Sequence, residues 1–319
     1  MNTALLKLGV ALREAGYAFT AISPPSHRRV NDREGNELAR DLRGVFGWNR
    51  PFAQGLLAPH IMALMREAGI LDAHALGYKS ALRAATLDGK LFFHSGFPTS
   101  QSDAVFFGPD TYRYGQLLQT GIDDETRLRA RRAVDIGCGA GPGAVLLAQY
   151  LPHAEVWGVD INPKALALAA VNAELAGAGQ VRLAHSDLLR GLAGQFDVIA
   201  ANPPFMLDTD QRTYCHGGGE LGEGLSLAIV ASAVERLAAG GTLLLYTCVA
   251  IVDGRDPFYS RLQQLLPAAR FNWHYREIDP DVFGGELGRE AHARASTERI
   301  AAVALQATSR PHLPEQGHS

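Results

Sequence analysis

The pattern of apolar and polar positions is regular in the second part of the chain. From about residue 131, short apolar runs alternate with longer segments in which apolar residues recur at helical spacing. The short runs predict buried strands over residues 131–137, 154–160, 180–187, 196–202, 241–250, 271–278 and 298–307. The longer segments predict helices over residues 142–151, 162–177, 223–239 and 256–266. Strands that alternate with helices form a mainly parallel sheet covered on both faces. Because no helical pattern separates the last two strands, we expect one of them to be antiparallel.

Residues 1–103 have a different pattern. Apolar residues at helical spacing predict helices over residues 3–17, 35–47 and 58–71. Two β-like runs follow on either side of Asp88-Gly89, a dipeptide typical of tight hairpin turns. Helices followed by a hairpin are typical of a small winged-helix-like domain, which could recognise substrate or act as a lid. The polar residues 308–319 predict a disordered tail.

Composition and charge exclude several classes of partner. The chain has 319 residues, 47% of them hydrophobic and 20% charged, as in ordinary globular proteins. A net charge of −3 gives no general attraction for nucleic acid or for an anionic membrane. The longest apolar run, residues 241–252, is too short to span a bilayer. Three widely spaced cysteines match no disulfide or metal-ligand spacing. We therefore expect a cytoplasmic protein that binds no metal and no membrane.

A glycine-rich turn, VDIGCGAGPG, lies between the first predicted strand of the sheet and its helix. Backbone N–H groups at the start of such a helix are expected to point outward, toward a ligand. Gly137, Gly139 and Gly141 permit close approach to the main chain. The turn is not a dinucleotide-binding pattern, because its sixth position is Pro142, and no P-loop lysine follows.

Two aspartates follow the next two predicted strands. Asp160 ends the second strand of the sheet, where a carboxylate can accept hydrogen bonds from both ribose hydroxyls. Asp187 ends the third, where it can receive an adenine amino group. Alone, each could be a helix cap or a turn residue. Together with the glycine turn they occupy the crevice at which such sheets bind ligands, so the cluster favours a nucleoside.

These three segments, VDIGCGAG, VWGVDIN and AHSDLL, resemble in order and spacing the motifs of class I S-adenosylmethionine-dependent methyltransferases. The resemblance covers about residues 104–307. It implies an α/β fold, a doubly wound, seven-stranded Rossmann-like sheet with the last strand antiparallel. It implies S-adenosylmethionine as cofactor, with contacts from Asp135, Gly137, Gly139, Asp160, Ile161, Asp187, Leu188 and Asn202. The upstream segment FFGPDTYRYG is similar to the one that precedes the first motif, which places Thr111 against the cofactor.

The fourth strand of the predicted sheet ends in Asn-Pro-Pro-Phe, residues 202–205. Two prolines fix the backbone and remove two donors, so the Asn202 side-chain oxygen and the Pro203 carbonyl form a rigid, acceptor-rich corner. Phe205 adds a flat apolar face. Such a corner can hold the hydrogens of a planar nitrogen and orient its lone pair toward a methyl group. Asn202, Pro203, Pro204 and Phe205 are therefore the candidate catalytic residues, and a merely structural turn is the alternative.

Asn-Pro-Pro-[Tyr/Phe] resembles the motif of small-type methyltransferases that act on nucleobase amines or on the glutamine amide of release factors. The separate N-terminal segment favours RNA over protein glutamine as substrate, although the near-neutral charge does not. A small-molecule substrate would require an enclosed apolar pocket, whereas a macromolecule would require an open cleft edged by Arg28 and Arg29. A non-catalytic cofactor-binding module is a further alternative. His216 could act as a base or be an ordinary loop residue, and Gly217–Gly219 suggest a flexible lid.

Overall fold

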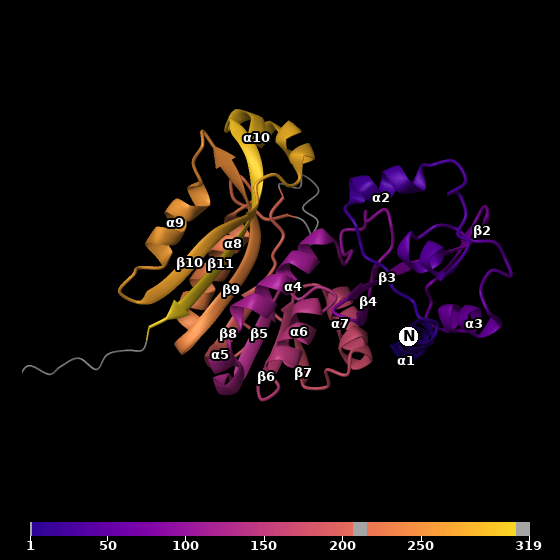
Figure 1. Cartoon of the computed structure of the whole chain (residues 1–319), viewed down its shortest axis with the longest axis horizontal. Helices are drawn as coiled ribbons and strands as arrows, with labels where there is room; N and C mark the ends of the chain where they lie inside the picture. The colour runs from indigo at the N-terminus through magenta and orange to yellow at the C-terminus, as the bar shows by residue number, and fades with distance from the viewer. Residues whose placement is uncertain (1, 207–215, 311–319) are drawn as a thin grey trace, which may run out of the picture.

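The computed structural model describes residues 2–206 and 216–310, and a seven-stranded sheet forms its centre (Figure 1). Its strand order is β10-β11-β9-β8-β5-β6-β7. The strands are β5 (Arg132–Ile136), β6 (Glu155–Asp160), β7 (Val181–His185), β8 (Phe196–Ala201), β9 (Leu237–Val252), β10 (Phe271–Asp279) and β11 (Thr297–Ser309). Strand β11 runs antiparallel to both of its neighbours, while the pairs within β5–β9 are parallel. The predicted doubly wound sheet with an antiparallel last strand is confirmed.

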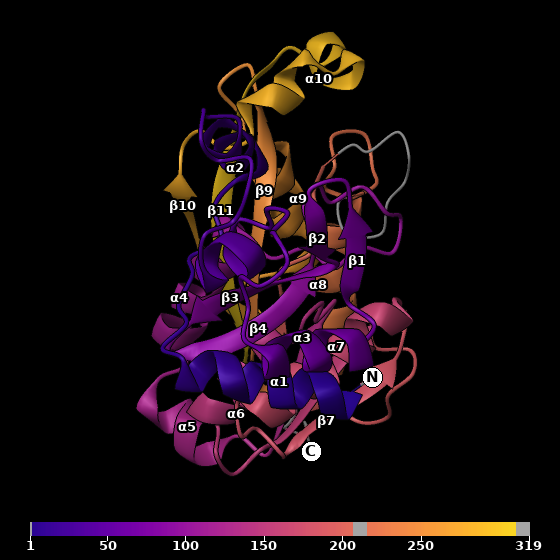
Figure 2. The same ribbon diagram turned by 90° about the vertical axis from the view of Figure 1, so that its right-hand side faces the viewer.

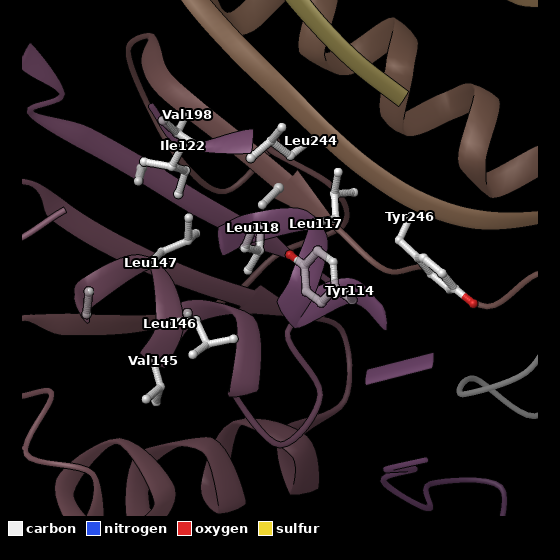
Figure 3. Packing of buried hydrophobic residues seen from close by; sticks show 14 of the residues in the cluster. Tyr114, Leu117, Leu118, Ile122, Val145, Leu146, Leu147, Val198, Leu244 and Tyr246 are labelled. Atoms are coloured by element: carbon white, nitrogen blue, oxygen red, sulfur yellow. The ribbon is translucent and has the colours of Figure 1, made fainter. Parts of the chain in front are cut away.

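Helices cover both faces of this sheet, because successive residues of each strand point to opposite sides. On one face, Ala133 and Leu244 pack against α4 (Pro109–Gly121) and α6 (Pro142–Tyr150), as Figure 3 shows for part of this cluster. On the other face, Val134 and Leu245 pack against α8 (Gly224–Arg236) and α9 (Pro257–Leu265). A short helix, α5 (Asp124–Arg129), leads into β5. Strands buried on both faces explain the continuous apolar runs of the sequence.

The strand order determines where the ligand crevice lies. Strand β5 lies between β6 and β8, so the chain proceeds in opposite directions from it across the sheet. Loops that follow the strands on either side of such a point diverge and leave room between them. The glycine turn after β5 and the loops after β6, β7 and β8 therefore lie at one edge of the sheet.

The N-terminal segment contains the predicted helices α1 (Asn2–Glu14) and α3 (Pro59–Glu67) and the predicted hairpin. Its strands are β3 (Leu82–Leu87) and β4 (Lys90–Ser95), joined by Asp88 and Gly89, both at positive φ. Its hydrophobic core is shared with one helix of the methyltransferase-like part of the chain. Its buried side chains cluster with those of α7 (Pro163–Leu175), and Figure 2 shows α1 and α3 beside that helix.

Two expectations for irregular regions are wrong, and two elements were not predicted. The helix expected over residues 35–47 is only a five-residue π-helical turn, η1 (Arg43–Gly47). Two unpredicted elements lie nearby, helix α2 (Pro24–Asn31) and the hairpin of β1 (Leu71–His74) and β2 (Gly77–Ser80). The connection between β10 and β11 does contain helical turns, η2 (Gly284–Gly288) and α10 (Glu290–Arg294).

The C-terminal end of the described chain extends beyond the expected boundary. Thr308 and Ser309 were expected in a disordered tail but belong to β11, where they pair with β10. The remainder of the expected tail, residues 311–319, lies outside the described residues. Within residues 2–206 and 216–310, no helix combines the length and the apolar character needed to cross a membrane.

Candidate active site

A cavity of about 1190 Å³ lies at the carboxyl ends of the parallel strands. It is lined by all twelve candidate residues: Thr111, Asp135, Gly137, Gly139, Asp160, Ile161, Asp187, Leu188, Asn202, Pro203, Pro204 and Phe205. The cavity continues beyond them between α2 and the connection from β10 to β11. There its walls include Ser23, Arg28, Arg29, Phe283 and Arg289. The fold thus brings the four sequence segments to one place.

The glycine turn differs in one respect from expectation. Gly137, Gly139 and Gly141 all have positive φ, of 67°, 53° and 84°, which explains the glycines. However, the N–H groups of Gly137 and Cys138 both donate to the Val159 carbonyl, and that of Gly139 donates to Asp160. These three donors of the turn are therefore bonded within the protein, and at the start of α6 itself the Ala144 N–H donates to Asp135 rather than pointing outward. The turn contributes open space instead, since a side chain at Gly137 would meet no atom within 4 Å.

Asp135 is buried at the end of β5, and both of its carboxylate oxygens are bonded. One accepts a 2.7 Å hydrogen bond from the Tyr114 hydroxyl, and the other accepts one of 2.9 Å from the Ala144 N–H, in the first turn of α6. A side chain at Gly143 would lie 2.5 Å from the same carboxylate, so only glycine fits there. Burial raises the pKa of Asp135 to about 7, although the two hydrogen bonds oppose this shift.

Asp160 holds the glycine turn to the next loop. Its carboxylate accepts from the Gly139 N–H and from the Asn162 N–H, each at 2.9 Å. Each oxygen keeps a second lone pair, so the expected acceptance of ribose hydroxyls remains sterically and chemically feasible. Burial raises the pKa of Asp160 above its usual range. Ile161 beside it is 49% exposed, an apolar side chain left open at the cavity wall.

The turn after β7 presents Asp187 and Leu188. Leu188 has a positive φ of 52°, and the Ser186 hydroxyl stabilises this turn by donating to the Leu188 carbonyl at 2.8 Å. Asp187 is exposed and forms an ion pair with Arg190. Its proposed adenine contact would compete with that exposed pair, which holds the carboxylate only weakly.

Thr111 lies in the first turn of α4, where its hydroxyl accepts from the Gly108 N–H at 3.3 Å. The preceding residue, Asp110, is buried and accepts a 2.6 Å hydrogen bond from the Tyr246 hydroxyl of β9. Arg113 contacts Asp110 and bonds Asp279 at the end of β10 at 2.8 Å. This network fixes the start of α4 against the sheet beside the cavity.

The Asn-Pro-Pro-Phe turn leaves its polar side chain open. Asn202 lines the cavity, and its side-chain amide makes no hydrogen bond within the described part of the chain. Pro203 is buried and Pro204 half-buried behind it. The Phe205 ring lies beside Phe283, with ring centroids 5.0 Å apart and planes inclined at 60°. A rigid turn with an amide open to the cavity is an available binding group rather than a strand terminator alone.

Gly217, in the segment expected to form a flexible lid, packs against this turn. The Gly217 N–H donates to the Met206 carbonyl at 2.9 Å, and its own carbonyl accepts from Leu225 at 2.7 Å. A side chain at Gly217 would lie 2.1 Å from the Gly222 carbonyl oxygen and 2.7 Å from Phe205 Cα. Gly217 therefore packs directly against the turn. His216, considered as a base, pairs with Met206 and is not among the cavity-lining residues.

Comparison with known proteins identifies the family. Over residues 114–250 the chain matches the methyltransferase small domain. A release factor glutamine methyltransferase from Deinococcus radiodurans is 32% identical over 264 residues, covering 75% of this chain and 88% of that protein. A ribosomal protein uL3 glutamine methyltransferase from Xanthomonas campestris pv. campestris is 34% identical over 234 residues, covering 69% of this chain and 72% of that protein. The chain belongs to the small-domain methyltransferase family.

This methyltransferase is also similar to a solved structure, the tRNA m1G37 methyltransferase of M. jannaschii. The TM-score is 0.48 and the identity 15%, over 74% of this chain and 59% of that one. Like its family, the present methyltransferase uses S-adenosylmethionine, which supplies an electrophilic methyl group on a sulfonium sulfur. The cavity residues fit this group: open space at Gly137, an exposed apolar side chain at Ile161 and spare lone pairs on Asp160. Within the described residues, no cluster of three or more His, Cys, Asp or Glu could hold a metal ion.

Several residues in or directly beside the cavity escaped the sequence analysis. Tyr114, Asp110 and Tyr246 form buried hydrogen bonds between segments distant in sequence, and no local pattern marks such pairs. Phe283 was assigned to an unstructured connection, although the Gly284-Gly285 pair after it could have marked a tight turn.

Proposed function

We propose that this methyltransferase modifies the side-chain amide nitrogen of a glutamine in a protein. Support comes from relatives that carry the names release factor glutamine methyltransferase and ribosomal protein uL3 glutamine methyltransferase, both matched over more than two thirds of their length. A bacterial release factor and ribosomal protein uL3 are therefore the first acceptors to test.

The observation that carries the proposal is the open amide of Asn202 beside Phe205. A primary amide nitrogen has two hydrogens and a delocalised lone pair, which makes it a poor nucleophile. In this proposal the Asn202 side-chain oxygen and the Pro203 carbonyl are the two acceptors, and the prolines restrict the backbone that carries them. Acceptors that bind both hydrogens favour the geometry in which the lone pair points at the methyl carbon.

In the reaction, the amide nitrogen forms a bond to the methyl carbon while the bond from carbon to sulfur breaks. Positive charge passes from the sulfur to the nitrogen, next to the two oxygen acceptors. Their interaction with the hydrogens strengthens as this charge develops, which lowers the barrier. The methylated amide then loses one proton to water. No protein base is needed, in agreement with the position of His216 away from the cavity lining.

For cofactor binding we propose the roles inferred from the motifs. Asp160 would accept the ribose hydroxyls, Ile161 would cover the adenine ring, and Asp187 with the Leu188 backbone would bind the adenine edge. Asp135 would interact with the positively charged part of the cofactor, and Thr111 would lie against it. All six line the same cavity.

We further propose that residues 1–103 recognise the acceptor protein and that residues 104–307 carry the methyl transfer. Arg28 and Arg29 of α2 line the cavity and are exposed, and their side chains make no ion pair within the described residues. A cavity edged by exposed arginines favours a macromolecule over an enclosed small molecule. RNA has less support than protein, because the relatives named above are both glutamine methyltransferases.

The proposal can be tested with S-adenosylmethionine labelled in its methyl group. The purified enzyme is incubated separately with a release factor, with uL3 and with total RNA, all isolated from cells that lack glutamine methyltransferases. We expect label in one of the two proteins, on a glutamine located by peptide mass spectrometry. Label that enters only RNA or the small-molecule fraction would refute the proposal.

A further inference from the structure

Phe283 lies at the start of the connection from β10 to β11, and its ring contacts Phe205 of the catalytic turn. The ring centroids are 5.0 Å apart and the planes are inclined at 60°. Both residues line the cavity, and both pack against the same hydrophobic cluster. Phe283 is therefore a second aromatic wall beside the acceptor position, contributed by a segment distant in sequence from the Asn-Pro-Pro-Phe motif.

The backbone holds Phe283 in an unusual conformation. Its φ of 55° is in the left-handed region, which a bulky residue without a short polar side chain rarely adopts. Hydrogen bonds hold the segment on both sides: the Val282 N–H donates to Ile300 at 2.8 Å, and the Glu286 N–H donates to the Phe283 carbonyl at 2.8 Å. Strained conformations that are held in this way concentrate at ligand-binding positions. The backbone of Phe283 is thus fixed by the surrounding structure, and its ring contacts Phe205.

The position of this ring restricts what can lie beside Phe205. A nucleobase recognised by stacking needs a parallel face and the space next to it. A ring inclined at 60° and 5.0 Å away takes up part of that space and cannot complete a parallel stack. A primary amide on an unbranched aliphatic side chain is narrower and needs no stacking partner. It can pass between the two rings to the acceptors at Asn202.

We propose that Phe283 is a specificity-determining residue, which admits a glutamine side chain to the catalytic turn and excludes a nucleobase. The inference rests on the proposed function and adds a physical reason for the choice of glutamine over a nucleobase. The Asn-Pro-Pro-Phe motif alone does not separate these two substrate classes. Phe283 acts by shape, through the width of the passage at Phe205, and takes no part in the proton or methyl transfer.

The first test compares Phe283→Ala and Phe283→Leu with Leu287→Ala. Leu287 belongs to the same connection and is half-buried in the same cluster but does not line the cavity, so it reports general damage to the segment. With the acceptor protein that the wild type methylates, supplied in its unmethylated form, we expect Phe283→Ala to lower kcat/KM about tenfold or more, mainly through KM, as for a lost apolar contact in a binding site. Phe283→Leu should recover part of the loss. Equal losses in Phe283→Ala and Leu287→Ala, or no loss in either, would overturn the inference.

A second test needs no acceptor protein, so its outcome is separate from that of the proposed function. The enzyme is saturated with S-adenosylhomocysteine, and binding of cytidine is followed by saturation-transfer NMR. We expect a cytidine signal with Phe283→Ala and none with the wild type or Leu287→Ala. Equal signals in wild type and Phe283→Ala would overturn the inference whether or not a glutamine is methylated. Absence of methyl transfer to both candidate proteins would instead refute only the proposed function.

Discussion

The Tyr114 hydroxyl donates a 2.7 Å hydrogen bond to the buried Asp135 carboxylate and so joins helix α4 to the end of β5 at the cofactor cavity. Both side chains are almost inaccessible to solvent, as Figure 3 illustrates for the packing around Tyr114. The hydrogen bond stabilises the ionised carboxylate, whereas burial destabilises it and prevails, leaving the pKa of Asp135 at about 7. The charge on this carboxylate therefore changes within the physiological pH range.

The first prediction concerns the pH dependence of cofactor binding. S-adenosylmethionine carries positive charge, so its proposed contact favours ionised Asp135. Below the pKa of about 7, binding must first remove a proton, and affinity falls as the pH decreases; above it, affinity reaches a plateau. Tyr114→Phe removes a hydrogen bond that lowers this pKa, so the plateau should begin at a higher pH. Isothermal titration calorimetry across this pH range measures both curves.

The control for this prediction is Tyr259→Phe, which removes a hydroxyl from an exposed tyrosine of α9 on the other face of the sheet. Its affinity curve should coincide with that of the wild type. A curve for Tyr114→Phe that is unshifted, or shifted to lower pH, would contradict the assigned role of Asp135.

The second prediction concerns Asn202. Asn202→Ala removes one of the two acceptors proposed to hold the amide nitrogen, while the cofactor cavity keeps most of its walls. We expect turnover to fall by roughly 10²- to 10³-fold, as for the loss of one oriented transition-state partner, with the Kd for S-adenosylmethionine little changed. Single-turnover kinetics with the unmethylated acceptor protein measure the effect. Asn272→Ala, on the exposed side of β10, is the control. Turnover of Asn202→Ala within about twofold of wild type would exclude the role.

The spacing of apolar residues was sufficient to predict the elements that bury one face or both faces. The strands of the sheet were predicted by their apolar runs, and Asp160, Asp187 and Asn202 were brought together because parallel strands end at the same edge. The family resemblance then supplied the cofactor.

Residues 35–47 show why the N-terminal segment was harder to predict. Their apolar spacing is helical, but side chains bond the backbone instead: Arg40 donates to the Gly35 carbonyl at 2.7 Å, and Asp41 accepts from the Gly44 N–H at 2.6 Å. Such local bonds compete with helix formation.

The contact of Phe283 with Phe205 could not be predicted from the spacing of apolar residues either. It depends on how the connection after β10 crosses the end of the sheet.

The third prediction concerns the support of the Asn-Pro-Pro-Phe turn by Gly217. A methyl group at this position would lie 2.1 Å from the Gly222 carbonyl oxygen, 2.7 Å from Phe205 Cα and 2.9 Å from the Pro204 carbonyl oxygen. All three are backbone atoms, so the turn itself must move in Gly217→Ala. Because misplacement of a reacting group by a fraction of an ångström is costly, we expect kcat to fall about tenfold or more. The Kd for S-adenosylmethionine should change little.

Gly179→Ala provides the matched control for that experiment. Gly179 is exposed, and a side chain there would meet no atom within 4 Å. Its kcat should equal that of the wild type. If Gly217→Ala also has the kcat of the wild type, the glycine segment does not position the turn.

The fourth prediction concerns Asn172, a fully buried residue of α7 that links the N-terminal hairpin to the glycine turn. Its side-chain oxygen accepts from the Phe93 N–H at 2.8 Å, and its amide group donates to the carbonyls of Phe93 at 2.9 Å and Ala140 at 2.8 Å. The side chain thus pairs with β4 as a neighbouring strand would, and it also fixes the residue after Gly139.

Asn172→Ala would leave one buried donor and two buried acceptors without partners. Each such group costs about 1–3 kcal/mol, so we expect the free energy of unfolding to fall by at least about 3 kcal/mol. The glycine turn also loses an anchor at Ala140, so the affinity for S-adenosylmethionine should decrease in the same variant. Urea unfolding and calorimetric titration measure the two effects, with the exposed Asn272→Ala as control. A loss below about 1 kcal/mol would mean that water replaces the amide, and that the hairpin and the cofactor turn are held together by apolar packing between α1, α3 and α7 instead.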